Sequence, residues 1–255
     1  MDATVPSFAD LTFFFPMWNE EEMILRTVDA ARQTGDELVA QRVIGAYEIL
    51  IVDDASTDAT GKIADELAAA DPRVRAVHHE VNRKLGGSVR TGLREAGAEL
   101  VVYTDADMPF DLNDLHKALR LLRIYDADIV SAYRFDRTGE GAQRAVYSHI
   151  YNFIVKTLLR LRVRDVNFAF KVIRREVLQH VELVSEGSFI DAELLAKAQR
   201  RGFHIIQFGV DYFPRARGTS TLSSPAVIVK IVRELAALLP SVRAVTPLPE
   251  NTSRR

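Results

Sequence analysis

Short apolar runs alternate with longer amphipathic segments through the first half of the chain. The apolar runs predict β-strands at 11–16, 47–54, 73–79, 99–105 and 127–134. The segments between them carry apolar residues at helical spacing and predict α-helices at 19–33, 56–72, 85–97 and 112–123. Apolar strands separated by amphipathic helices are typical of an α/β fold, with a mostly parallel sheet covered by helices on both faces.

The second half of the chain has a less regular pattern. Helical spacing of apolar residues predicts helices at 141–162, 188–202 and 226–240. Two further runs predict a strand leading into a short helix at 166–178 and a strand at 203–213. The basic, Ser/Thr-rich stretch 214–225 reads as a loop, and 241–255 has no periodicity and is predicted to be a disordered tail. No repeat or low-complexity linker divides these elements, so we expect one domain over residues 1–240.

Composition and charge narrow the class of protein. The chain of 255 residues is 47% hydrophobic and 27% charged, with a formal net charge of −2, which is ordinary for a soluble globular protein and gives no sign of a nucleic-acid binder. There is no cysteine, so a metal would have to be held by oxygen or imidazole. The first residues lack a basic signal-peptide region, and no run approaches the ~20 apolar residues of a membrane span. We therefore expect a cytoplasmic protein, with peripheral membrane contact left open.

Acidic residues follow two of the predicted strands. Asp53 and Asp54 end the strand at 47–54, and Asp105 and Asp107 follow the strand at 99–105. In open α/β sheets the ligand lies beyond the carboxyl ends of the strands, so these carboxylates should gather at one edge. Two carboxylates one residue apart suit a divalent cation, Mg²⁺ or Mn²⁺, that bridges a diphosphate. Taken alone, the D-x-D tripeptide fits a helix cap beside a solvated aspartate equally well.

Seven motifs in order give the acidic pairs a context. They are FFPMWNEEEMI, EILIVDDASTDAT, NRKLGGSVRTGL, VVYTDADMPFD, DVNFAFKVIRREVL, SFIDAELLAKAQRRG and YFPRARGTSTLSS. Over residues 10 to 224 this set resembles the family-two glycosyltransferases of GT-A fold, which transfer a sugar from a nucleotide donor with inversion. The pattern is most similar to the polyprenyl-phosphate branch, which includes dolichyl-phosphate mannose synthase. The resemblance implies a Rossmann-like fold, with a nucleotide-sugar-binding half at 10–134 and an acceptor-binding half at 135–240.

The resemblance also implies roles on the donor side. Pro16, Trp18 and Glu20 would line the base and ribose pocket, with Trp18 where the family usually has tyrosine. One of Asp53 and Asp54 would accept a hydrogen bond from the nucleobase, and the other would cap the following helix.

The D-x-D motif would hold the metal and the diphosphate. Asp105 would approach the ribose or the metal, and Asp107 would ligate the metal on the diphosphate. Some relatives place a glutamine ligand two residues later, where this chain has Pro109, so water or another group must replace it. Lys84 stands where many relatives have glycine; it is either a phosphate contact or a solvated lysine.

The acceptor side would be basic, because guanidinium groups match phosphate oxygens in pairs. The residues expected around the diphosphate and the acceptor phosphate are Arg134, Arg144, Arg215, Arg217 and Ser220. Asp191, within the D-x-E-L-L pattern of members that act on lipid phosphates, would orient the acceptor or balance an arginine. Asp107, Asp191 and Arg134 are therefore the expected catalytic residues.

The leading hypothesis is transfer of a hexose from a UDP- or GDP-sugar to a polyprenyl phosphate. The alternative is a soluble transferase that acts on a hydroxyl of a small metabolite or saccharide, with Asp191 as the base. A third possibility is a nucleotide-sugar-binding protein without catalysis, against which the joint presence of the acids and the arginine loop argues.

Overall fold

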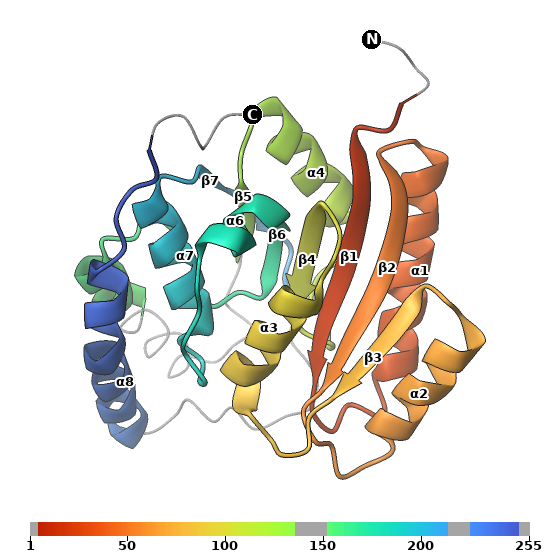
Figure 1. The fold of residues 1–255 in the computed structure, drawn as a ribbon, viewed down its shortest axis with the longest axis horizontal. Helices are drawn as coiled ribbons and strands as arrows, with labels where there is room; N and C mark the ends of the chain where they lie inside the picture. The colour runs from red at the N-terminus through yellow and green to blue at the C-terminus, as the bar shows by residue number, and fades with distance from the viewer. Residues whose placement is uncertain (1–4, 136–151, 214–224, 250–255) are drawn as a thin grey trace.

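The computed structural model describes residues 5–135, 152–213 and 225–249. Within these residues, seven strands form one sheet in the order β3-β2-β1-β4-β6-β5-β7 (Figure 1). The strands are β1 (Phe8–Met17), β2 (Ile44–Asp53), β3 (Val74–His78), β4 (Leu100–Thr104), β5 (Ile129–Arg134), β6 (Phe170–Arg174) and β7 (Ile205–Val210). All neighbouring pairs are parallel except those that β6 makes with β4 and β5. The predicted α/β fold with a mostly parallel sheet is confirmed.

Helices cover both faces of the sheet (Figure 1). They are α1 (Ile24–Ala40), α2 (Thr60–Ala70), α3 (Lys84–Glu95), α4 (Asp114–Ile124), α6 (Arg175–His180), α7 (Ile190–Arg201) and α8 (Pro225–Arg243). Residues 152–159 are also helical. Helices α1, α2 and α4 contribute to one apolar cluster, and α3, α6, α7, α8 and the 152–159 helix contribute to the other.

Strand β1 shows how the sequence produces these two layers. Successive strand residues point to opposite faces, so Phe13 and Phe15 enter one cluster while Phe14 enters the other. All three side chains are fully buried, and burial of each stabilises the fold by roughly 1.5–3 kcal/mol. A strand that is buried on both faces needs an unbroken apolar run, which is what made it visible in the sequence.

Several predicted boundaries shift by a few residues, and two of them involve a proline. Strand β1 was predicted over 11–16, ending at Pro16, but it spans Phe8–Met17. Its pairing with β4 ends at Phe14, whereas its pairing with β2 continues to Met17, so Pro16 has a neighbouring strand on one side only. A proline is tolerated at such a place because it has no N–H to leave unpaired.

The end of the chain gives the second correction. Helix α8 continues through Pro240 to Arg243 instead of ending there. Val242 is buried against the α7 layer, and the Leu248 amide donates to the Arg201 carbonyl at 3.0 Å. This packing offsets the hydrogen bond that Pro240 cannot make. Residues 241–243 are therefore helical although the sequence there has no periodicity, and 250–255 lie outside the described residues.

No helix of the described residues is long and apolar enough to cross a membrane.

Candidate active site

The carboxyl ends of β1, β2, β3 and β4 meet at one edge of the sheet, where the predicted acidic pairs lie. Met17 at the end of β1 pairs in register with Asp53 at the end of β2, and Asp53 pairs with His78 at the end of β3. The Asp54 amide then donates to the Met17 carbonyl at 2.9 Å. Parallel pairing thus brings residues that are distant in sequence to one edge, as expected for this class of sheet.

Asp53 is buried and bound by the chain on both carboxylate oxygens. The Nδ1 atom of His78 donates to Oδ2 at 2.9 Å, and the Ser56 amide donates to Oδ1 at 3.1 Å. Burial alone would lower the pKa of His78, but its hydrogen bonds to Asp53 and Asp65 raise that pKa above its ordinary value.

Asp54 is equally enclosed, and its partners come from a second histidine and from the start of α3. The Nδ1 atom of His79 and the Arg83 amide both lie within hydrogen-bond distance of Oδ1, at 2.6 and 2.8 Å. The other ring nitrogen of His79 is 2.9 Å from the Thr91 hydroxyl. Neither aspartate caps helix α2, which starts without a side-chain cap. The pair therefore fixes the loops that surround the strand ends.

The predicted base-pocket segment is held against the loop that follows β2. The Asn19 amide donates to the Ser56 hydroxyl at 3.0 Å, and the Glu20 amide donates to the Thr60 hydroxyl at 2.8 Å. Trp18 is 56% exposed, so it is not part of the core. Its indole is presented at the surface of this edge, next to half-buried Pro16.

The loop that carries Asp105 and Asp107 is anchored by several contacts to other elements. The Thr27 hydroxyl of α1 donates to the Ala106 carbonyl at 2.6 Å, and the Phe213 amide donates to the Pro109 carbonyl at 2.8 Å. Phe110 stacks on Phe170 with a centroid distance of 4.5 Å. The loop is thus fixed from α1, from β6 and from the segment after β7.

Asp105 and Asp107 are both half-buried at this edge. Two carboxylates on one anchored loop give a hard divalent cation part of its oxygen shell, and the rest is available to a diphosphate and water. No cluster of three or more metal-ligating side chains occurs among the described residues. Pro109 supplies no side-chain ligand.

Asp191 lies in the core at the start of α7. It is 2% exposed, and its Oδ1 lies 2.6 Å from the Nζ of Lys171, although the two are not aligned for a hydrogen bond. The aligned bond of Lys171 goes to the Phe168 carbonyl at 2.7 Å. Burial raises the pKa of Tyr103 well above its ordinary value, and the charges of Asp191 and Asp105 raise it further. The Tyr103 hydroxyl has no hydrogen-bond partner in the described part of the chain.

The antiparallel strand β6 explains why Lys171 is there. Because β6 runs against its neighbours, its first residues lie at the edge where β4 and β5 end, and Lys171 is in register with Tyr103 and Ser131. Nothing in the local sequence distinguishes this lysine from one that ends a strand.

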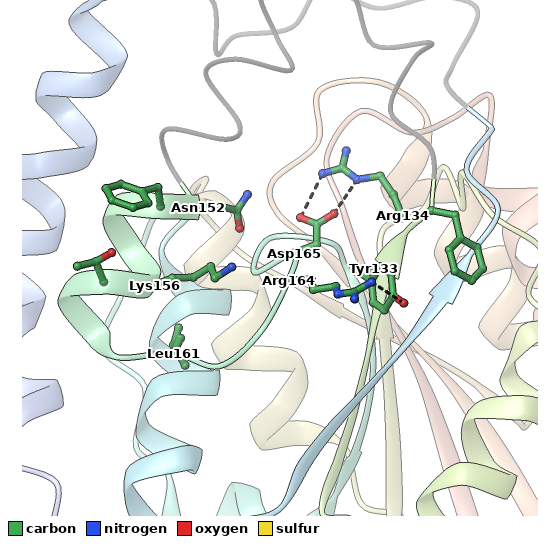
Figure 2. Close-up of a pocket in the computed structure, with 10 residues that line it drawn as sticks. Tyr133, Arg134, Asn152, Lys156, Leu161, Arg164 and Asp165 are labelled. Atoms are coloured by element: carbon green, nitrogen blue, oxygen red, sulfur yellow. Dashed lines mark hydrogen bonds and ion pairs between the residues drawn. The ribbon is translucent and has the colours of Figure 1, made fainter.

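Arg134 ends β5 and lines a cavity of about 780 Å³ (Figure 2). Its Nε and Nη2 donate to the two oxygens of Asp165 at 2.8 and 3.2 Å. Its guanidinium also lies over the rings of Phe168 and Tyr212. Further lining residues are Tyr133, Phe135, Asn152, Phe153, Lys156, Thr157, Leu161 and Arg164. The cavity combines an apolar wall with three cationic side chains and one buried carboxylate.

Lys84 is exposed at the first position of α3, with φ at 61°. This left-handed backbone conformation favours glycine, which gives a physical reason for the glycine in the family pattern at this position. Arg144, Arg215, Arg217 and Ser220 lie outside the described residues.

Sequence reasoning missed several residues of this edge. Asp165, the partner of Arg134, stood inside a motif already singled out, but a lone aspartate carries no signal of its partner. Glu193 is buried and accepts hydrogen bonds from the amides of Val184 and Ser185 and from Lys197, so it fixes the segment before α7. Lys156 and Arg164 are visible as basic residues, yet their place at the cavity depends on tertiary packing.

Comparison with known proteins shows to which protein family this chain belongs. Residues 12–182 match the family described as Glycosyl transferase family 2. Glycosyltransferase AglD of Haloferax volcanii is 32% identical over 218 residues, which are 84% of this chain; the chain spans about a third of AglD (34%). Undecaprenyl-phosphate mannosyltransferase of Micrococcus luteus is 28% identical over 243 residues, covering 90% of this chain and 96% of that protein.

A solved structure shares the fold. Glucosyl-3-phosphoglycerate synthase from Mycobacterium tuberculosis, in complex with Mn²⁺ and UDP-glucose, superposes with a TM-score of 0.65 at 18% identity, covering 95% of this chain and 81% of that one. Fold and site therefore define a glycosyltransferase of GT-A fold. The chain belongs to glycosyltransferase family 2, because the family match covers well over half of its length.

Proposed function

We propose that this enzyme transfers a hexose from a UDP- or GDP-linked donor to a polyprenyl phosphate, with inversion and with dependence on Mg²⁺ or Mn²⁺. The observation that carries the proposal is that the anchored Asp105/Asp107 loop and the cationic Arg134 cavity lie at the same edge of one sheet. A relative named for undecaprenyl phosphate, similar over nearly its whole length, supports the same acceptor class.

In this proposal the donor lies over the ends of β1, β2 and β4. Exposed Trp18 offers an aromatic face to the base, beside Pro16 and Glu20. Asp53 and Asp54 keep their internal partners and set the shape of the base pocket, with one of them also meeting the nucleobase edge. Asp105 and Asp107 would hold the divalent ion, which when bound would neutralise the leaving diphosphate.

The acceptor phosphate would enter the cavity of Arg134. Its cations balance the phosphate charge, and Phe135, Phe153 and Leu161 provide apolar surface for the first isoprene units. A phosphate oxygen forms the new bond to the anomeric carbon while the bond from that carbon to the diphosphate oxygen breaks, and the diphosphate leaves with the electron pair. Attack from the opposite face inverts the configuration. Arg144, Arg215, Arg217 and Ser220 would add contacts to the phosphates.

The buried position of Asp191, beside Lys171, favours a phosphate acceptor over a hydroxyl acceptor. A hydroxyl acceptor needs a carboxylate within reach to take its proton. Asp191 instead lies in the core beside Lys171. A phosphate is already ionised near neutral pH and needs no such base, so Asp191 would act through charge balance below the reacting groups.

The test has two parts. Calorimetry with UDP, GDP and their hexose conjugates, in Mg²⁺ or Mn²⁺, should show one donor that binds tightly and stabilises the fold. Transfer is then measured with a polyprenyl phosphate and with the matched polyprenol, which differs by the phosphate alone. Product should form with the phosphate, with the opposite anomeric configuration to the donor. Transfer to the polyprenol or to a soluble sugar, with none to the phosphate, would overturn the proposal.

A further inference from the structure

The 152–159 helix and the segment after it are unusually basic. Residues 152–164 read NFIVKTLLRLRVR, with four cations, Lys156, Arg160, Arg162 and Arg164, and no acidic residue. Apolar side chains stand among them at the surface, since Phe153 is 71% exposed and Leu158 is 46% exposed.

Two arginines from other elements extend this surface. Arg200 of α7 and Arg243 at the end of α8 join Arg160 around a second cavity of about 320 Å³, whose walls include Leu158 and Leu239. The Arg200 guanidinium is held in place because it donates to the carbonyls of Arg243 and Val245. We call the six residues the cationic rim: Lys156, Arg160, Arg162, Arg164, Arg200 and Arg243.

The cationic rim lacks carboxylate partners in the part of the chain that the structure describes. Within the described residues none of its six side chains forms an ion pair with a carboxylate, whereas Arg73 near the donor edge pairs with both Asp36 and Asp71. A solvated basic face is the ordinary explanation for scattered cations. Here, however, exposed Phe153 and Leu158 belong to the same short segment as four of the cations, and a surface that mixes cations with exposed apolar side chains is typical of segments that lie in a membrane interface.

Members of the cationic rim line both cavities. Lys156 and Arg164, with exposed Phe153, line the cavity of Arg134, while Arg160, Arg200 and Arg243 line the second cavity, and the 152–159 helix contributes to both. Figure 2 shows Asn152 and Lys156 directed from this helix toward Asp165 and Arg134. A surface next to the acceptor cavity would contact the membrane or other carrier that holds the acceptor.

We infer that the cationic rim is the surface on which an anionic phospholipid bilayer docks, with Phe153 and Leu158 at the headgroup boundary. This inference rests on the proposed function and deepens it. Docking of the cationic rim would bring a membrane-held polyprenyl phosphate close to the cavity of Arg134. Charge complementarity selects the partner: clustered unpaired cations attract an anionic leaflet, and the exposed apolar side chains bury themselves in its interface.

The test is sedimentation of the full chain with vesicles of phosphatidylcholine alone or with 30% phosphatidylglycerol. The wild type should bind the anionic vesicles, and raised salt should weaken that binding. The double variant R160E/R162E changes two cations of the rim that lie outside the Arg134 cavity. Each cation near an anionic surface changes binding about fivefold, so the variant should lose at least about 30-fold.

The matched control is R26E/R120E, which makes the same change in charge at exposed positions on α1 and α4. It should keep vesicle binding within about threefold. Both variants should keep the wild-type melting temperature and donor affinity, which shows that they are folded. Activity on a water-soluble, short-chain isoprenyl phosphate should also survive in R160E/R162E, whereas activity on acceptor in anionic vesicles should fall.

Three results would overturn the inference while leaving the proposed function intact. In the first, R160E/R162E binds anionic vesicles as well as the wild type does. In the second, the wild type binds neutral and anionic vesicles equally, and in the third it binds RNA or heparin but not vesicles. Failure of transfer to the short-chain phosphate by the wild type would instead count against the proposed function.

Discussion

At the β1–β3 end of the sheet edge the buried carboxylates are held by histidines and backbone amides, whereas at the β5 end the buried carboxylate of Asp165 is held by an arginine guanidinium. Asp53 and Asp54 accept hydrogen bonds from His78, His79 and backbone amides near the strand ends. Arg134 is neutralised by Asp165, which lies 31 positions further along the chain. The donor end is thus built from the ends of the parallel strands β2 and β3, whereas the acceptor end pairs the end of β5 with a residue of the segment before β6. Breaking the histidine contacts of the donor end and breaking the ion pair of the acceptor end should therefore have different costs.

The largest effect is expected from Asp107→Asn at the boundary between the two ends. It keeps the shape of the side chain but removes a metal-binding charge, so kcat/KM should fall at least about 100-fold, with the melting temperature nearly unchanged. Steady-state kinetics over a Mn²⁺ titration measures this. Asp111→Asn, the same change at an exposed position of the same loop, is the control and should remain active. An equal loss of kcat/KM in both variants would show that Asp107 has no special role in binding the metal.

Asp165→Asn tests the buried pair of the acceptor end. Because Arg134 is only 11% exposed and would lose its counter-charge, the free energy of unfolding should fall by about 3 kcal/mol. The KM for the acceptor should rise more than the KM for the donor. Urea unfolding and two-substrate kinetics measure the two effects.

Asp29→Asn is the control for this pair, because it breaks an ion pair to Arg32 in which Asp29 is 73% exposed. It should cost less than about 0.5 kcal/mol. Similar costs in the two variants would show that the Arg134–Asp165 pair is no more important than a surface contact.

His78→Gln tests the donor end by its pH dependence. The pKa of His78 is raised in the folded state, so its contribution is complete below the unfolded value of about 6.5 and is lost as pH rises through the folded pKa. The variant should therefore be more destabilised at pH 5.5 than at pH 8.5. The difference should be below about 1 kcal/mol, because the side chain is 37% exposed. Urea unfolding at both pH values, with exposed His204→Gln as control, measures it, and a larger loss at pH 8.5 would contradict this sign.

The smallest effect is expected from Lys84→Gly. Glycine relieves the left-handed backbone at φ 61° but gains entropy in the unfolded chain, so stability should rise by about 0.5 kcal/mol. Lys84→Ala removes the same charge and keeps the strain, which separates the two contributions. Calorimetry should show donor affinity falling threefold or less in both variants. A larger, salt-dependent loss in both would make Lys84 a phosphate contact.

Hydrophobic patterning predicted the sheet because strands buried on both faces need continuous apolar runs. It predicted the donor acids for a related reason: a parallel strand ends where its apolar run ends, so the polar residues that follow must lie at the same edge. Boundaries failed where tertiary packing outweighed local preference, as at Pro16 and Pro240.

The chain's own sequence determined the α/β fold, the family and the acidic loops at the strand ends, because each depends on residues close together in the chain. The tertiary structure alone decided that β6 runs antiparallel, that Asp191 pairs with Lys171, and that Arg134 pairs with Asp165 beside a cavity. Such pairs join positions separated by about 20 to 30 residues, and a buried charge is recognised only when the opposite charge that neutralises it is in place.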